Sequence, residues 1–404
     1  MEKRKAASAP PSVRAGEELI LECYQRSVEL LKKNSRPSGV IACARSEKAV
    51  DMNYASVFGR DAAICALGMA VSGDRTLLRN ARLGLRTLAR YQAPTGQIPK
   101  YVKPESEEVD FWYAGCVDAT LWWLIAVDFL SRLSPSAGGL REELGREVGL
   151  ALNWLSCQEH QGMHLVAQNE ASDWADIMPR SGFVLYSNAL WYFVKTLYGI
   201  PTARETGRYF NLVFWPFGGE VPENRRARVL CHYVRNRARR SDFFLSFVNF
   251  TFWGEDLDVF GNVLAMLLGP VEASRAGRLA DRLLRLGANE PYPVRVVLNP
   301  IGRRSRLWRP YMERHRLNRL WQYHNGGIWP FAGGFWVMLL AKLAREDLAW
   351  RELARVAEAN RLGGWSFNEW LHGRSGEPMG MPGQSWNAAM FVLAFESLRK
   401  KLRL

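Results

Sequence analysis

The 404-residue sequence lacks any run of eighteen or more apolar residues, so it contains no candidate for a membrane-spanning helix. It also lacks the local signatures of several enzyme classes: there is no GxSxG elbow, no HExxH, no P-loop and no glycine-rich dinucleotide turn. The six cysteines are scattered, with neither a CxxC pair nor metal-finger spacing. His324 and His372 have no second ligand at helical spacing. We therefore expect reduced thiols, a cytoplasmic location, and no metal, cofactor or membrane association.

The N-terminal stretch is rich in charge, proline and alanine, and it lacks the apolar centre of a secretion signal. We expect residues 1–16 to form a flexible arm and residues 17–404 to form a single domain. No later segment has the composition of a disordered linker.

Acidic residues are fewer than basic ones, 40 against 54, which gives a net charge of +14. The densest basic segment runs from Arg225 to Arg240, and a second, interleaved with aromatic residues, runs from Arg303 to Arg319. Such segments occur in nucleic-acid-binding proteins. Because basic residues are spread over many segments, we expect solvated helix faces and Arg–carboxylate pairs, and we do not expect a nucleic-acid partner. The role of Arg225–Arg240 and a homo-oligomeric state are left open.

Alternating strand patterns are scarce, and residues 243–253 and 291–300 are the best candidates. Helical patterns dominate instead, as in residues 17–34, where apolar residues recur at intervals of three and four. About a dozen such segments follow one another as pairs joined by loops rich in glycine, proline and aromatics. This order predicts an all-α domain of the (α/α)6 toroid type.

The stretch QYHNGGIWPF, residues 322–331, combines several aromatic rings with an amide and two glycines. Aromatic planes stack on the C–H faces of sugars, and amides and carboxylates bind sugar hydroxyls. The same pattern is also compatible with a buried junction between a loop and a helix that begins at Pro330.

Cleavage of a glycosidic bond requires two carboxyl groups, one to protonate the leaving oxygen and one to attack or to activate water. Each candidate also has a structural interpretation, as an N-cap or an ion-pair partner. Glu369 is the strongest candidate, because burial among Trp365, Phe367 and Trp370 would raise its pKa. The candidates in aromatic-rich loops are Asp61, Asp118, Asp173, Asp176, Asp256, Asp258 and Glu369.

The order of several motifs resembles that of the (α/α)6 glycoside hydrolases of clan G, which include trehalases, processing α-glucosidases and alkaline/neutral invertases. YHNGGIWP, VDATLWW and the NEWLHG…GQSW segment are similar to motifs of the alkaline/neutral invertases, glycoside hydrolase family 100. GRDAAI and MPRSGFVLYSNALWY resemble motifs of the amylo-1,6-glucosidase domain of debranching enzymes. The resemblance runs from about residue 50 to the C-terminus.

The resemblance implies an inverting hydrolase with Asp176 as general acid and Glu369 as general base, and carboxyl groups roughly 6.5–9.5 Å apart. Asp118 is the reserve candidate for the acid. Trp329, His324 and Asn325 are expected to shape one wall of a sugar subsite. The full set of expected substrate-binding residues is Arg60, Asp61, Asp118, Trp174, Arg180, Tyr323, His324, Asn325, Trp329, Gln384 and Trp386.

The sequence departs from the invertase pattern at positions that bear on the substrate. Ile177 and Met178 replace a basic pair after the acid, NEWLH replaces PEYYD, and Ser187 stands where a Glu is expected. These changes leave the reaction type intact, and the resemblance implies hydrolysis of an α-glucosidic bond in sucrose or a related small saccharide. The alternatives are a debranching-type exo-glucosidase and a non-catalytic helical protein that binds carbohydrate or RNA.

Overall fold

The computed structural model describes residues 11–112, 116–133 and 139–404, and these are predominantly helical. None of the helices in these residues is long and apolar enough to cross a membrane. The helices are α1 (Pro11–Asn34), α2 (Glu47–Asp51), α3 (Gly59–Val71), α4 (Arg75–Arg90), α5 (Val117–Leu133), α6 (Leu140–Glu143), α7 (Gly145–Cys157), α8 (Leu185–Tyr198), α9 (Ala203–Phe214), α10 (Arg225–Arg237), α11 (Val259–Leu268), α12 (Ala273–Arg285), α13 (Pro330–Lys342), α14 (Glu346–Trp365) and α15 (Ser385–Lys400).

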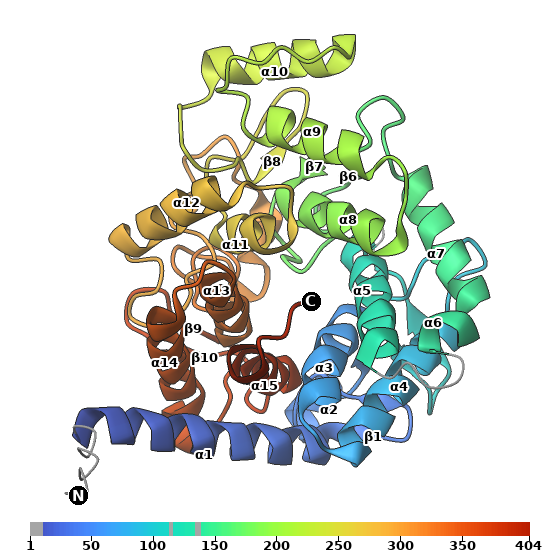
Figure 1. Cartoon of the computed structure of the whole chain (residues 1–404), viewed down its shortest axis with the longest axis vertical. Helices are drawn as coiled ribbons and strands as arrows, with labels where there is room; N and C mark the ends of the chain where they lie inside the picture. The colour runs from blue at the N-terminus through green and yellow to red at the C-terminus, as the bar shows by residue number, and fades with distance from the viewer. Residues whose placement is uncertain (1–10, 113–115, 134–138) are drawn as a thin grey trace, which may run out of the picture.

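Six of these helices form a closed inner ring. In order around the ring they are α3, α5, α8, α11, α13 and α15, each packed on the next, and α15 packs back against α3 (Figure 1). The inner helices are apolar on nearly all sides: 12 of the 13 residues of α3 and 11 of the 13 residues of α13 are buried. A helix that is hydrophobic all round must be covered on every face. The composition of these segments therefore places them at the centre.

A second set of helices forms the outer ring. Helices α4, α7, α9, α12 and α14 each pack on the inner helix that precedes them in the chain, and α1 packs on α15 and α14. These helices are amphipathic, and α12 buries only 4 of its 13 residues. The expected (α/α)6 toroid is confirmed.

Close contact between inner helices depends on small residues. A Cβ atom on Gly68 of α3 would lie 2.0 Å from the carbonyl oxygen of Ala389 in α15, and one on Gly334 of α13 would lie 2.9 Å from the Met390 oxygen. Glycine therefore allows α15 to approach both of its neighbours in the ring.

The strands are short and lie in the loops that connect the helices. Neither strand expected from the sequence is present at the expected length: residues 243–253 contain only a two-residue strand, and residues 291–300 contain isolated bridges. Most of their apolar residues are buried against the helical core, with Phe250 the main exception, and this burial explains the strand-like pattern. The strands form four antiparallel groups: β1 (Ser35–Arg36) with β2 (Gly39–Val40); β3 (Val57–Phe58), β4 (Tyr101–Lys103) and β5 (Glu108–Asp110); β6 (Ala167–Gln168), β7 (Gly182–Val184) and β8 (Phe247–Val248); and β9 (Trp370–Leu371) with β10 (Pro378–Met379).

The N-terminal segment differs from the expectation. Helix α1 begins at Pro11, so the flexible arm expected over residues 1–16 is helical from that residue onward. Residues 1–10 lie outside the described part of the chain. The basic segment after Arg225 forms α10, which packs on α9 outside the two rings (Figure 1).

Candidate active site

The N-terminal ends of the inner helices surround a cavity of about 330 Å³. Arg60 and Asp61 lie in the first turn of α3, Trp329 directly precedes α13, and Gln384 directly precedes α15. The loops that lead into these helices supply the remaining side chains. The cavity is lined by Ala42, Met52, Asn53, Tyr54, Phe58, Arg60, Asp61, Lys100, Tyr101, Trp112, Trp174, Asp176, Tyr323, His324, Trp329, Glu369, Gln384 and Trp386.

Asp176 is held in this cavity by an ion pair. The Nζ atom of Lys100 lies 3.0 Å from Oδ1 of Asp176, and the side chain of Lys100 is only 6% exposed. Burial opposes ionisation of Asp176, but the positive charges of Lys100 and Arg60 outweigh it and lower the pKa of this carboxyl group. Asp176 is therefore a carboxylate in the resting site at neutral pH.

Glu369, the second predicted catalytic carboxyl, has the opposite electrostatic environment. It is 5% exposed, and burial raises its pKa to about 7. Two hydrogen bonds counteract part of this effect: Tyr54 donates its hydroxyl to Oε1 at 2.7 Å, and the Met381 amide donates to Oε2 at 3.0 Å. Glu369 thus titrates near neutrality while its orientation is fixed from both sides.

Several donors in the cavity have no hydrogen-bond partner among the described residues, although one of them, Nη1 of Arg60, lies 3.6 Å from Oδ2 of Asp118 as an ion pair. They are the indole Nε1 atoms of Trp174 and Trp386 and the Nη1 atom of Arg60. Arg60 also pairs with Asp61 at 3.1 Å, and burial raises the pKa of Asp61 despite this contact. Buried donors without partners are costly unless a ligand satisfies them. Two indole donors, a guanidinium and a carboxyl together suit the hydroxyls of a sugar ring.

Aromatic rings form one wall of the cavity. The imidazole of His324 lies parallel to the indole of Trp329, with ring centroids 5.0 Å apart, and Trp174 packs edge-on against both. Burial lowers the pKa of His324 to about 3, so its ring is neutral and does not serve as an acid near pH 7. Tyr323 packs against His324 and Trp329 in this wall, and its hydroxyl lies 3.5 Å from Oδ2 of Asp176.

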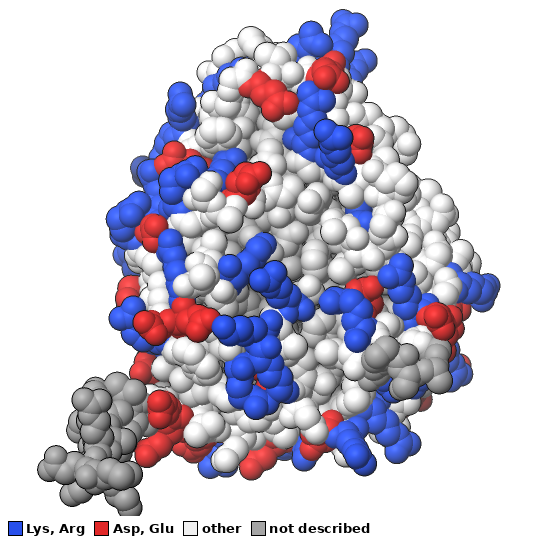
Figure 2. Space-filling model, in the orientation of Figure 1, with Lys and Arg blue, Asp and Glu red and all other residues white. Residues whose placement is uncertain are grey.

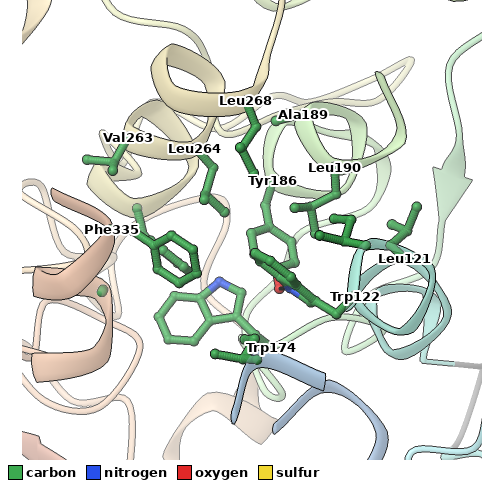
Figure 3. Close-up of a cluster of buried hydrophobic side chains, with 14 of the residues drawn as sticks. Leu121, Trp122, Trp174, Tyr186, Ala189, Leu190, Val263, Leu264, Leu268 and Phe335 are labelled. Carbon is green, nitrogen blue, oxygen red and sulfur yellow. Dashed lines mark hydrogen bonds between the residues drawn. The ribbon is translucent and has the colours of Figure 1, made fainter. Parts of the chain in front are cut away.

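Trp174 also connects the cavity to the apolar core. Figure 3 shows its indole beside Tyr186, Trp122 and Phe335, which belong to three different inner helices. The Tyr186 hydroxyl accepts a hydrogen bond from Trp122 at 2.7 Å and donates one to Asp118 at 3.0 Å. The core therefore orients the side chains that form the base of the cavity.

Three of the expected substrate-binding residues do not line the cavity. Asp118 is fully buried, and its oxygens accept hydrogen bonds from Cys116 and Tyr186. Arg180 forms ion pairs with Asp256 at 3.2 Å and Asp258 at 3.1 Å. These contacts make Asp118 and Arg180 part of the support beneath the cavity.

Asn325, the third, holds a loop together. Its side-chain amide accepts a hydrogen bond from the Ile301 backbone amide and donates to the carbonyls of Ile301 and Asn318. The neighbouring Gly327 is required by a tight turn, because a Cβ atom there would lie 2.5 Å from the Tyr323 carbonyl oxygen. The tight turn is sufficient to explain the glycine at position 327, and no ligand close to the backbone is needed.

The remaining candidate carboxylates are also structural. Asp258 caps α11 by accepting from the Gly261 amide at 3.0 Å. Asp173 accepts hydrogen bonds from Gln168 and from the Ala175 amide, so it orders the loop that carries Asp176 and does not begin a helix.

The two polar residues that contact the predicted catalytic carboxyl groups, Tyr54 and Lys100, were not predicted from the sequence. Tyr54 lies only a few residues before the GRDAAI motif, so the aromatic residue upstream of this motif was an available signal. Lys100 lies next to β4, and its ammonium group is 2.9 Å from the centroid of the Trp112 ring. Nothing in the local sequence distinguishes Lys100 from other lysines. Its partner is 76 positions away, and only the fold brings the two together.

Comparison with solved structures identifies the fold. The mannosylglycerate hydrolase of glycoside hydrolase family 63 from Thermus thermophilus, solved with Tris and D-glycerate, superposes with a TM-score of 0.65 and 16% identity over 92% of this chain and 99% of that one. A structure described simply as a glycosidase gives 0.65 and 11%, over 97% and 99%. The glucoamylase of Hormoconis resinae gives 0.63 and 11%, over 95% and 73%. The fold is that of the (α/α)6 glycosidases.

A family match adds the chemistry. Residues 259–401 match the model of the alkaline and neutral invertase family, which is 143 of 404 residues. The matched segment includes Glu369 but not Asp176, which lies upstream of it. No curated protein sequence matches the chain significantly. With this match on the (α/α)6 fold, the chain is a glycoside hydrolase of the six-hairpin class, and its substrate is a saccharide.

Proposed function

We propose that this glycoside hydrolase cleaves an α-glucosidic bond in sucrose or a related small saccharide with inversion at the anomeric carbon. Asp176 acts as general acid and Glu369 as general base. The proposal is carried by one observation: two carboxyl groups with different environments share a cavity that also holds unpartnered indole donors. Its volume of about 330 Å³ is at the small end of the range for ligand sites, which favours a short saccharide.

In the proposed reaction, Glu369 takes a proton from a water molecule as the water oxygen bonds to the anomeric carbon. The glycosidic C–O bond breaks, and Asp176 delivers a proton to the leaving oxygen. A base is most effective when its pKa is close to the working pH, and the pKa of about 7 suits Glu369 to this role. Tyr54 would keep the carboxylate aimed at the water.

To act as the general acid, Asp176 must carry a proton, but the resting site favours its ionised form. Lys100 stabilises Asp176 as a carboxylate, so the bound substrate has to draw Lys100 away or reduce its effect before proton transfer. A hydroxyl or carboxylate of the leaving group near Lys100 would do this. Lys100 therefore belongs to the part of the site that contacts the leaving group.

The ion pair between Lys100 and Asp176 favours a second candidate function. A buried lysine beside the proton donor suits a leaving group that carries a carboxylate, because the carboxylate would take over the ion pair with Lys100. The family 63 relative is a mannosylglycerate hydrolase whose structure contains D-glycerate. Glycosides of small hydroxy acids are thus the alternative to sucrose.

A substrate panel separates these possibilities. Sucrose, isomaltose, a branched glucan, glucosylglycerate and mannosylglycerate would be incubated with the enzyme, and released sugar measured by NMR, which also reports the anomer formed first. We expect inversion and a preference for one short substrate. Retention of configuration, or release from the branched glucan alone, would contradict the proposal.

Variants test the catalytic pair directly. Asp176→Asn and Glu369→Gln should each lower kcat by about 10²–10⁴-fold, because each removes one partner in proton transfer. Glu377→Gln is the matched control, since Glu377 is an exposed carboxylate of the same loop region. Near-normal turnover in either of the first two variants would overturn the assignment.

A further inference from the structure

Helix α12 carries a row of arginines that the proposed reaction does not use. Arg275, Arg278, Arg282 and Arg285 are spaced by three, four and three residues, so they lie on one face over about three turns. The buried residues of the helix, such as Leu279 and Leu283, face the core. Figure 2 shows Lys and Arg side chains gathered along the edge of the molecule where α12 lies in Figure 1.

These arginines line a cavity of about 560 Å³, larger than the candidate active site. One end is formed by Trp215, whose ring centroid is 4.3 Å from the guanidinium carbon of Arg275. Phe244 contacts the same guanidinium, at 4.2 Å, so aromatic rings fix Arg275 in place. Burial, together with the charge of Arg278, lowers the pKa of Arg275 to about 10, which leaves it protonated at neutral pH.

The positive charge in this cavity is only partly balanced. Its two carboxylates are already engaged: Asp242 pairs with Arg282, and Asp281 forms an ion pair with Arg345 at 2.6 Å. In the described residues, no carboxylate lies within ion-pair distance of Arg275, Arg278 or Arg285. Like charges three and four residues apart on one helix repel each other. The helix would therefore gain stability from a bound anion.

Phosphate groups match this arrangement better than a single carboxylate does. The guanidinium group donates two parallel hydrogen bonds to phosphate oxygens, and arginine is favoured over lysine in such sites. Several guanidinium groups around one surface hollow suit a ligand with more than one phosphate. Helix α10 is also basic, but it contributes no residue to this cavity. All four arginines come from one helix and span only about three turns, which favours a small ligand over an extended nucleic-acid backbone.

We propose that the α12 cavity, formed by Arg275, Arg278, Arg282, Arg285 and Trp215, is a binding site for a small ligand with two or more linked phosphate groups. The site is separate from the glycosidase cavity, and its residues do not overlap with the catalytic set. The inference does not depend on which sugar the enzyme cleaves.

Tripolyphosphate is the test ligand, with binding measured by isothermal titration calorimetry at low and physiological salt. We expect saturable one-to-one binding that weakens with salt, because guanidinium–phosphate attraction is screened. Arg278→Gln combined with Arg285→Gln should weaken binding at least tenfold, since both side chains are exposed and have no carboxylate partner to leave behind. Sugar turnover and the circular dichroism spectrum should be unchanged in this variant.

The matched control is Arg75→Gln combined with Arg79→Gln, which removes two exposed arginines from the outer helix α4. It should bind tripolyphosphate as the wild type does. Equal loss in both double variants would show a diffuse charge effect and overturn the site. The proposal would also be overturned if no saturable binding were seen at physiological salt. Tighter binding of a single-stranded oligonucleotide than of tripolyphosphate would overturn it as well.

Discussion

The hydrogen bond from Tyr54 to Glu369 offers the sharpest test of the catalytic roles. Replacing Tyr54 by Phe removes the donor 2.7 Å from Oε1 but keeps the ring. A hydrogen bond to a charged group contributes about 1.5–3 kcal/mol, and one pKa unit corresponds to about 1.4 kcal/mol. Because water in the cavity can replace part of the bond, we take the lower value. The pKa of Glu369 should then rise from about 7 to about 8.

The consequence is a change in kcat/KM that depends on pH. A general base must be ionised, so at pH 6 the variant should be about tenfold less active than the wild type. By pH 9 Glu369 is ionised in both proteins, and the ratio should approach one. Initial rates at substrate concentrations well below KM, measured from pH 5 to pH 9, give this ratio directly. Tyr311→Phe is the matched control, because Tyr311 donates to Glu170 outside the cavity.

The same experiment can refute the assignment of roles. If Glu369 were the acid, its protonated form would be active, and at pH 8 the variant would be about fivefold more active than the wild type. A loss of activity that is equal at all pH values would show that Tyr54 binds substrate without tuning Glu369. Only a deficit that disappears as the pH rises agrees with Glu369 as the base.

Two further predictions concern Glu369. Gly380→Ala should lower kcat by about 10²-fold, because the new Cβ atom would lie 2.5 Å from Oε2 of Glu369 and displace the base. The control is Gly73→Ala, at a glycine with a similar φ but in open space, and this variant should retain kcat. Glu369→Gln should become more stable relative to the wild type as the pH rises from about 4.5 to about 7, because the native wild type holds a proton that the unfolded chain has released. Between pH 5 and pH 8 the difference in the free energy of unfolding, measured with urea, should grow by about 2.5 kcal/mol, and a constant difference would contradict the raised pKa.

Local sequence was sufficient to predict the fold class. About a dozen helical segments, joined in pairs by loops and without a disordered linker, predicted the (α/α)6 toroid. The buried apolar loops misled the same reasoning: residues 243–253 and 291–300 read as strands because burial, and not sheet pairing, selects their apolar residues. The helical start at Pro11 was missed because its composition resembles that of a flexible arm.

At the candidate site, the sequence by itself determined which residue types were present and in what order. Asp176, Glu369 and Trp329 were candidates because they lie in aromatic-rich loops, and the resemblance to clan G hydrolases implied the roles of the two carboxyl groups. Only the tertiary structure decided which of them share a cavity. Asp118 and Arg180 lie in the core that supports the cavity. In the folded chain Lys100 contacts Asp176, and Tyr54 contacts Glu369. The physical reason is distance along the chain: partners 76 and 315 positions apart leave no local pattern, and they meet only because inner helices far apart in sequence begin at the same end of the ring.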